Sequence, residues 1–505
     1  MTTSLSSAEV SSLRDANIQT SGPRAEASIP KPVEPAVYRV PHTLASRFIF
    51  LNLCVAIVLS ALAFGTVHYW ALVLFSLGAL ATVVLWVIDA WRLGKLRISR
   101  NPLQIPLLGM LALGLIQLLP LRDTADTGAL TLPASRALSF DPYSTRMVLV
   151  QVATLLIYFA ATLVFTDTPH RLRLLVRTII IFGFFLAIFG LTQSLVSPTR
   201  VYWVRELAQS TAFGPFINRH HFAGYMELTL GLTLGLLLAG SLEKEKRFIY
   251  LFAALLMGVA LIMTNSRGGI ISVVAEILFL VALTMFRKRK RREAQDKVQR
   301  IRNAALRSAL ALALIVGLFA GVVLLGGESV LSRFVGTVNS DDPTTGRAHF
   351  WSVTTDIIKA HPFLGTGLGA FAVVYTRYDS RNGLYRLEQV HNDYLQVLSD
   401  GGIVGAVLGL LFIVMLFRMA FASRESRDDF RSGVAIGALA GCFAVLVHSF
   451  FDFTLHTTSN ALLFLVLAAL ATMNGRVEQS TAPRRRRRSR RRHQHPSAEP
   501  TMIRP

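Results

Sequence analysis

The stretch HNDYLQVLSDGGIVGAVLGLLFIVMLF, residues 391–417, passes from a cluster of polar side chains through two glycines into an apolar run. A helix needs about 20 consecutive, mostly apolar residues to cross a hydrocarbon core of about 30 Å. The run that starts at Ile403 predicts such a helix near 403–420. His391 is then expected just outside the membrane end of that helix.

Eleven further apolar runs lie along the chain, and 52% of its 505 residues are hydrophobic while only 16% are charged. The sequence therefore predicts an all-α polytopic membrane protein with about 12 transmembrane helices. The membrane domain is expected over 46–475, between a disordered tail at 1–45 and a basic disordered tail at 476–505. The twelve runs lie near 48–66, 70–89, 102–120, 147–166, 174–193, 221–240, 248–264, 269–286, 308–325, 403–420, 432–450 and 459–473.

The net charge of +22 is concentrated beside the apolar runs. Residues 287–307 and the tail from Arg476 each contribute +8, and both adjoin predicted helices. Positive charge at a helix end is first a signal of membrane orientation, and attraction to anionic lipids is a second effect. This distribution favours membrane lipids as partners and argues against nucleic acid, even for the RRRRRSRRR run at 484–492.

The basic connections also predict the orientation of the chain. If both termini are cytoplasmic, every even-numbered connection between predicted helices is cytoplasmic, and each of these connections is basic. Two examples are WRLGKLRISR at 91–100 and HRLRLLVR at 170–177. The opposite orientation would place all of these segments on the wrong side, so the odd-numbered connections are expected to face outward.

The outward connection at 326–402, between predicted helices nine and ten, is by far the longest, and loops of such length tend to be functional. Both cysteines, Cys54 and Cys442, fall inside predicted helices, so no disulfide is expected to order this loop. The sequence shows neither metal-ligand spacing nor a Walker-type phosphate loop. We therefore expect no metal site, no cofactor and no ATP-driven pump.

Four polar clusters fall on the predicted outward face. They are GPFINRHHFAGYMELTLG at 214–231 with Arg219, His220 and His221, TNSRGGI at 264–270 with Arg267, TTGRAHFWSV at 344–353 with Arg347, and HNDYLQ at 391–396 with His391, Asn392 and Tyr394. Arginine suits phosphate oxygens, and histidine can take a proton from a hydroxyl near neutral pH. Together they predict an anionic phosphate-ester substrate and a step that needs a base.

Each cluster also has a purely structural interpretation. An arginine at a helix mouth often only reaches lipid phosphates, and Arg347 could instead pair with Asp341 or Asp342. His220 and His221 are adjacent and cannot share one helical face, so at most one is expected to act. The convergence of three arginines and a histidine on one side of the bilayer favours the functional interpretation.

The order of the motifs NRHHFAG, SRGG, GRAHFW, HPFLGTGLGAF and HNDYLQVLSDGGIVG resembles the O-antigen ligase and polymerase superfamily of bacterial envelope glycosyltransferases. The segment DPYSTRMVLVQVATLL at 141–156 is also similar to the one that these proteins carry before their fourth helix. The resemblance covers roughly residues 45–475. It implies a GT-C-like fold in the bacterial inner membrane, with a long periplasmic loop between helices nine and ten.

The resemblance also implies the substrates. The donor would be a glycan on undecaprenyl diphosphate, used on the periplasmic face without a nucleotide sugar or a metal. A ligase would pass the glycan to a hydroxyl of lipid A–core, and a polymerase would pass it to another lipid-linked glycan. The sequence does not separate these two activities, and an exopolysaccharide polymerase or a protein–glycan ligase belongs to the same range.

The site roles carried over by motif fall into cations for the diphosphate, a base for the acceptor and support for that base. The cations would be Arg219, Arg267 and Arg347. The base would be His391, and its possible support would come from His221, Asn392 and Tyr394. The second histidine of the RHH motif leaves the role of His220 open.

Two other classes of protein remain as alternatives. A polysaccharide-lipid transporter would carry charged residues at mid-depth in its helices, for which Glu227 and Glu276 are the clearest candidates. A scaffold role would leave the outward arginines unexplained. A last motif, HSFFDFTLH with His448, Asp452 and His456, either lines the acceptor cleft or only ends the eleventh helix, and we favour the second interpretation.

Overall fold

The structure, a computed structural model, describes residues 42–122, 136–207, 212–285, 347–381, 387–423 and 428–473, together with five single residues between 305 and 317. Contacts divide the chain into the units Met1–Val40 and Pro41–Pro505, and every described residue lies in the second unit. The regular structure of the described residues is helical apart from one two-stranded antiparallel sheet.

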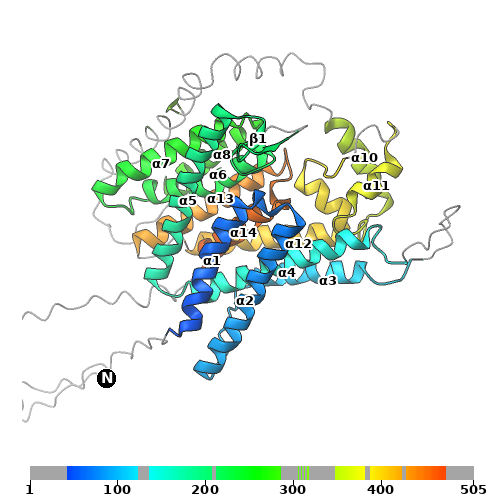
Figure 1. Cartoon of the computed structure of the whole chain (residues 1–505), viewed down its shortest axis with the longest axis horizontal. Helices are drawn as coiled ribbons and strands as arrows, with labels where there is room; N and C mark the ends of the chain where they lie inside the picture. The colour runs from blue at the N-terminus through cyan, green and yellow to red at the C-terminus, as the bar shows by residue number, and fades with distance from the viewer. Residues whose placement is uncertain are drawn as a thin grey trace, which may run out of the picture. The chain divides into compact units, whose positions relative to one another are not determined.

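Figure 1 labels most of these elements along the chain. In sequence order they are α1 (Leu44–Leu62), η1 (Phe64–Thr66), α2 (Tyr69–Leu93), α3 (Gln104–Gln117), α4 (Pro142–Phe165), α5 (Pro169–Val196), β1 (Arg200–Val201), β2 (Arg205–Glu206), α6 (Arg219–Leu238), α7 (Lys244–Met263), α8 (Arg267–Met285), α10 (Arg347–Ala360), α11 (Phe371–Tyr378), α12 (Asp393–Ser423), α13 (Asp429–His448), η3 (Thr454–His456) and α14 (Thr458–Thr472).

Eleven of the twelve predicted runs coincide with helices of the described residues, and the run at 308–325 lies almost wholly outside them. Among the described helices, nine are long and apolar enough to cross a membrane, and α3 and α14 are shorter apolar helices. Helices α2 and α12 expose many leucine and valine side chains, as lipid-facing helices do. The protein is therefore an all-α, multi-pass membrane protein, while the count of twelve and the sidedness remain predictions.

Local sequence signals explain where many of these helices begin. A side chain that accepts hydrogen bonds from the first free N–H groups precedes each of α1, α4, α5, α6 and α13, which is the usual role of an N-cap residue. Proline follows the cap in α4 and α5, where its missing N–H costs nothing. The N-cap residues are Thr43, Asp141, Thr168, Asn218 and Asp428.

Helices α6 and α13 pack closely because glycines line both helices where they meet. A Cβ atom added to Gly437 would lie only 2.6 Å from the carbonyl oxygen of Gly231, and one added to Gly235 would collide with Gly437 itself. Small residues let membrane helices approach each other closely, which matters because the hydrophobic effect contributes little to helix association inside a bilayer. Helix α6 is almost completely buried as a result, and it lies beside α8 and α13 in Figure 1.

We expect Gly437→Leu to destabilise the protein by about 1–3 kcal/mol or more, because the new side chain would overfill the α6–α13 contact. The matched control is Gly409→Leu on α12, since a Cβ atom added there meets nothing within 4 Å. The midpoint of thermal unfolding in detergent measures both variants. Equal midpoints for the two would contradict the packing described here.

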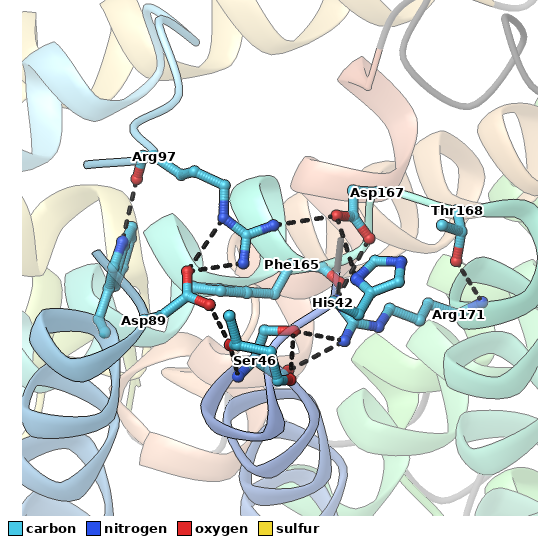
Figure 2. Close-up of polar contacts among 10 residues, drawn as sticks. His42, Ser46, Asp89, Arg97, Phe165, Asp167, Thr168 and Arg171 are labelled. Carbon is cyan, nitrogen blue, oxygen red and sulfur yellow. Dashed lines mark hydrogen bonds and ion pairs between the residues drawn. The ribbon is translucent and has the colours of Figure 1, made fainter. Parts of the chain in front are cut away.

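An ion-pair cluster joins the start of α1, the end of α2 and the α4–α5 connection (Figure 2). The Arg97 guanidinium donates to Asp89 at 2.7 Å and to Asp167 at 3.3 Å. Arg171 donates to Asp167 at 3.3 Å and to the Ser46 hydroxyl at 2.9 Å. These arginines belong to the segments in which we interpreted basic residues as a cytoplasmic signal, and the structure shows them paired with carboxylates as well. The cluster fixes these three chain segments at one end of the helices.

The segment expected as a long loop at 326–402 contains α10, α11 and the first part of α12 in its described residues. Helix α12 starts at Asp393, ten residues before the predicted start, and breaks at Gly402, whose φ of 59° lies in the left-handed region. At the break, the N–H groups of Ile403 and Val404 donate to the carbonyl oxygens of Pro362 and Phe363. The apolar run therefore marks only the second part of the helix.

Candidate functional site

The site lies at the helix ends opposite the ion-pair cluster of Figure 2. Helix α1 starts at that cluster and leads to η1, where the carbonyl oxygen of Thr66 accepts a 3.0 Å hydrogen bond from the Thr458 hydroxyl. Thr458 follows directly on the segment 449–457, which joins α13 to α14 and carries part of the site. A helix of 19 residues is about 28 Å long, close to the thickness of a hydrocarbon core.

The carboxylate of Asp452 is the point at which three basic side chains meet. His391 Nδ1 lies 3.2 Å from Oδ1, while Arg347 Nη2 and His220 Nδ1 lie 3.5 Å and 3.6 Å from Oδ2. Burial opposes ionisation of Asp452, but the His391 hydrogen bond and the electrostatic contacts with His220 and Arg347 outweigh burial and hold its pKa well below its usual range. Asp452 is therefore a buried anion at the centre of a cationic site.

His391 is held at this point by the turn that starts α12. Its backbone φ of 57° lies in the left-handed region, which is uncommon outside glycine. The next residue, Asn392, accepts hydrogen bonds from the N–H groups of Tyr394 and Leu395 and donates to the carbonyl oxygen of Phe450. Asn392 thus caps the helix and ties it to the end of α13, so the HNDYLQ motif begins a helix and is not a free loop.

Arg347 begins α10 and contacts two consecutive residues of the 449–457 segment. Its Nη1 donates to the carbonyl oxygen of Phe451 at 2.6 Å, and its Nη2 lies 3.5 Å from Asp452. The alternative partners considered from sequence, Asp341 and Asp342, lie outside the described residues. Arg347 is about one quarter exposed, so its guanidinium can reach a ligand as well as the carboxylate.

A chain of hydrogen bonds leads from His220 into the buried interior of the helices. His220 Nδ1 lies 2.8 Å from the Ser266 hydroxyl, which lies 3.3 Å from His448 Nε2. His448 Nδ1 in turn lies 2.7 Å from a carboxylate oxygen of Glu227, and both of these side chains are completely buried. A side chain at Gly268 would press on His448, since its Cβ atom would lie 2.7 Å from that ring.

The hydrogen bond between His220 and Ser266 also fixes the positions of two predicted cations. Arg219 is the first residue of α6 and directly precedes His220. Arg267 is the first residue of α8 and directly follows Ser266. Both arginines therefore stand at joined helix starts, where the positive ends of the helix dipoles favour an anion. The structure thus brings together the starts of α6, α8, α10 and α12, which carry the four clusters noted in the sequence.

The predicted support residues have structural contacts of their own. The rings of His221 and His391 each pack against Phe453, at 4.9 Å between centroids. The Tyr394 hydroxyl donates to the carbonyl oxygen of Leu446 at 2.7 Å. Of the two adjacent histidines, His220 contacts Asp452, whereas sequence reasoning had preferred His221.

Sequence reasoning missed the importance of the HSFFDFTLH motif. The sequence favours a simple helix end, whereas the structure places Asp452 among three basic groups and His448 against Glu227. His456 Nδ1 lies 2.7 Å from Asp393. Burial lowers the pKa of His456, but the hydrogen bond to Asp393 and the charges of Asp393 and Asp400 together outweigh burial and raise the pKa above its usual value. An acidic residue on the predicted outward face, where the sequence also places three arginines, was the signal that could have revealed Asp452.

The geometry allows two kinds of chemistry. The basic side chains can bind an anion, and the contact between His391 and the Asp452 carboxylate suits a histidine that accepts a proton. Among the residues that the structure describes, no group of three or more His, Cys, Asp or Glu side chains is placed to hold a metal ion.

The fold and the site define a multi-pass helical membrane protein with a cationic, histidine-containing site at one set of helix ends. Residues 252–410 match the family model described as O-antigen ligase, which confirms the resemblance noted in the sequence. The matched range contains Arg267, Arg347 and His391, whereas His220 and Asp452 lie outside it. No curated protein matches the chain.

Proposed function

We propose that the protein is an O-antigen ligase-type glycosyltransferase. It would move a glycan from undecaprenyl diphosphate to a hydroxyl of lipid A–core, on the periplasmic face of a bacterial inner membrane. The match to the O-antigen ligase family supports the reaction class. The observation that carries the proposal is the contact of His391 and Arg347 with one buried carboxylate, that of Asp452.

In this proposal His391 is the base for the acceptor hydroxyl. Its Nδ1 atom faces Asp452, which leaves Nε2 to take the proton. As the proton leaves, the acceptor oxygen forms a bond to the anomeric carbon, and the bond from that carbon to the diphosphate oxygen breaks. The Asp452 carboxylate stabilises the imidazolium that forms, because the opposite charge is already in place and needs no reorganisation.

Undecaprenyl diphosphate is already a good leaving group. The protein therefore has only to position it and to neutralise the charge that it carries. We assign this task to Arg219, Arg267 and Arg347, which stand at the helix starts around His391 and Asp452. An arginine binds two phosphate oxygens at once and stays charged at any physiological pH. The positive dipole ends of α6 and α8 add to the same field.

A deletion strain tests the reaction and separates its two variants. A ligase leaves free lipid A–core together with accumulated lipid-linked polymer. A polymerase leaves core that carries a single repeat unit. Normal surface polysaccharide of full length on the core of the deletion strain would contradict the proposed function.

Arg267→Lys is expected to reduce transfer about tenfold or more, because lysine keeps the charge but loses the bidentate fork. The matched control is Arg247→Lys on α7, an exposed arginine at the other end of the described helices that the proposal leaves outside the site. Transfer by purified protein in detergent measures both variants. Full activity of Arg267→Lys would remove Arg267 from the diphosphate site.

A further inference from the structure

A second basic cluster surrounds the aromatic ring of Phe140, away from the site at Asp452. The Arg122 guanidinium carbon lies 3.7 Å from the ring centroid, and that of Arg377 lies 5.5 Å from it. The ring of His361 packs edge-on at 5.0 Å, and its Nε2 lies 3.3 Å from the Tyr378 hydroxyl. Three basic side chains from three separate chain segments thus converge on one ring.

These like charges lack an acidic counterpart among the residues that the structure describes. No described carboxylate lies within ion-pair distance of Arg122 or Arg377. Asp141, which follows Phe140, uses its carboxylate to cap α4, and Asp379 on the α11 side pairs with His349, while Asp123 lies outside the described residues. Burial, Arg122 and Arg377 together lower the pKa of His361, as expected where positive potential is not balanced.

Exposed apolar side chains flank the basic cluster. Leu121 precedes Arg122, Phe363 follows shortly after His361, and Val373 lies one helical turn before Arg377 on α11. They are 68%, 72% and 47% exposed, respectively. Apolar side chains beside arginines are typical of the membrane interface, where the apolar groups enter the lipid and the cations meet phosphates.

We propose that Arg122, His361 and Arg377 form a binding site for the phosphate headgroup of an anionic membrane lipid. Phe140 holds the two guanidinium groups by cation–π contacts, and Arg122 also donates from Nη2 to the carbonyl oxygen of Leu138. The remaining N–H donors can bind phosphate oxygens. The exposed apolar neighbours would contact the acyl chains. This surface is separate from the diphosphate site, because its residues contact neither Asp452 nor His391 in the part of the chain that the structure describes.

Helix α10 relates the two sites, and this step rests on the proposed function. Arg347 begins α10 beside Asp452, and His361 follows its last residue, Ala360. A helix of 14 residues spans about 20 Å. A lipid phosphate at His361 would therefore lie far from the reacting hydroxyl.

The test titrates detergent-solubilised protein with short-chain phosphatidic acid and measures binding by native mass spectrometry. The variant is Arg122→Gln/Arg377→Gln, and the matched control is Arg381→Gln, an exposed arginine four residues after Arg377. We expect affinity to fall about tenfold or more in the double variant and to stay unchanged in the control. A double variant that binds as tightly as the control would overturn the proposal.

Additional binding measurements with other ligands identify the source of the phosphate. Short-chain phosphatidylcholine should bind more weakly than phosphatidic acid, because it carries no net negative charge. Inorganic phosphate should not displace phosphatidic acid at equal concentration; if it does, the cluster binds free phosphate and the lipid assignment is wrong. Arg122→Lys/Arg377→Lys should bind more tightly than the glutamine variant, which excludes loss of folding as the cause. None of these measurements requires transfer activity, so failure here is distinct from failure of the proposed function.

Discussion

Replacing His391 by alanine is expected to abolish glycan transfer while the protein still inserts and folds. His391 contacts the buried Asp452 carboxylate through Nδ1 and is 28% exposed, so a hydroxyl can reach its other nitrogen. Loss of a general base typically costs about 10²–10⁴-fold in rate. Initial rates of transfer by purified protein, with donor and acceptor both saturating, give the change in kcat.

The control for this variant is His170→Ala, which removes an exposed histidine near the start of α5. That variant should transfer glycan at the normal rate. Small primary amines or imidazole added to His391→Ala should restore part of the activity if the missing group is a base. Undiminished transfer by His391→Ala would refute the catalytic assignment and leave the histidine a structural role.

Replacing Asp452 by asparagine is expected to reduce kcat on the order of 10²-fold or more. The amide keeps the shape of the side chain but removes the negative charge that stabilises an imidazolium at His391. It also leaves His220 and Arg347 beside a neutral group. The effect should appear in kcat more than in KM, since the charge matters most when the proton has moved.

Asp379→Asn provides the comparison, because Asp379 also contacts a histidine, His349, at 2.9 Å, but outside the site. It should alter stability slightly and leave kcat unchanged. Thermal unfolding of both variants separates a loss of folding from a loss of chemistry, since an uncompensated buried charge can cost about 3–5 kcal/mol. Equal kcat values for the two variants would show that Asp452 is only structural.

Hydropathy predicted most of the helices because each membrane helix must satisfy the same length and polarity requirement independently of its neighbours. It failed where a helix extends beyond the apolar run. Helix α12 begins at Asp393, in polar sequence, because Asn392 caps it and the end of α13 supports it. Helices α10 and α11 likewise lie in a segment that lacks a membrane signal.

The candidate site was predictable only in part. Charge counting placed Arg347 and His391 on one face, because the side of the membrane follows from the number of crossings. The carboxylate between them was not predictable in the same way. Tertiary packing of four helix ends brings Asp452 to His220, Arg347 and His391. No local sequence pattern predicts this contact. The grouping of Arg122 and Arg377 around Phe140 depends on tertiary packing for the same reason.

The break at Gly402 has a consequence for hydrophobic mismatch. The part of α12 that follows the break runs from Ile403 to Ser423 and is about 31 Å long, which suits one crossing of the bilayer. The part before the break is tied to the α10–α11 connection, because the N–H groups of Thr366 and Gly367 donate to the carbonyl oxygens of Ser399 and Asp400. When the bilayer thickens or thins, the crossing part can tilt to match it. His391 keeps its position relative to α10 and the end of α13. The geometry of the site therefore does not change with the thickness of the bilayer.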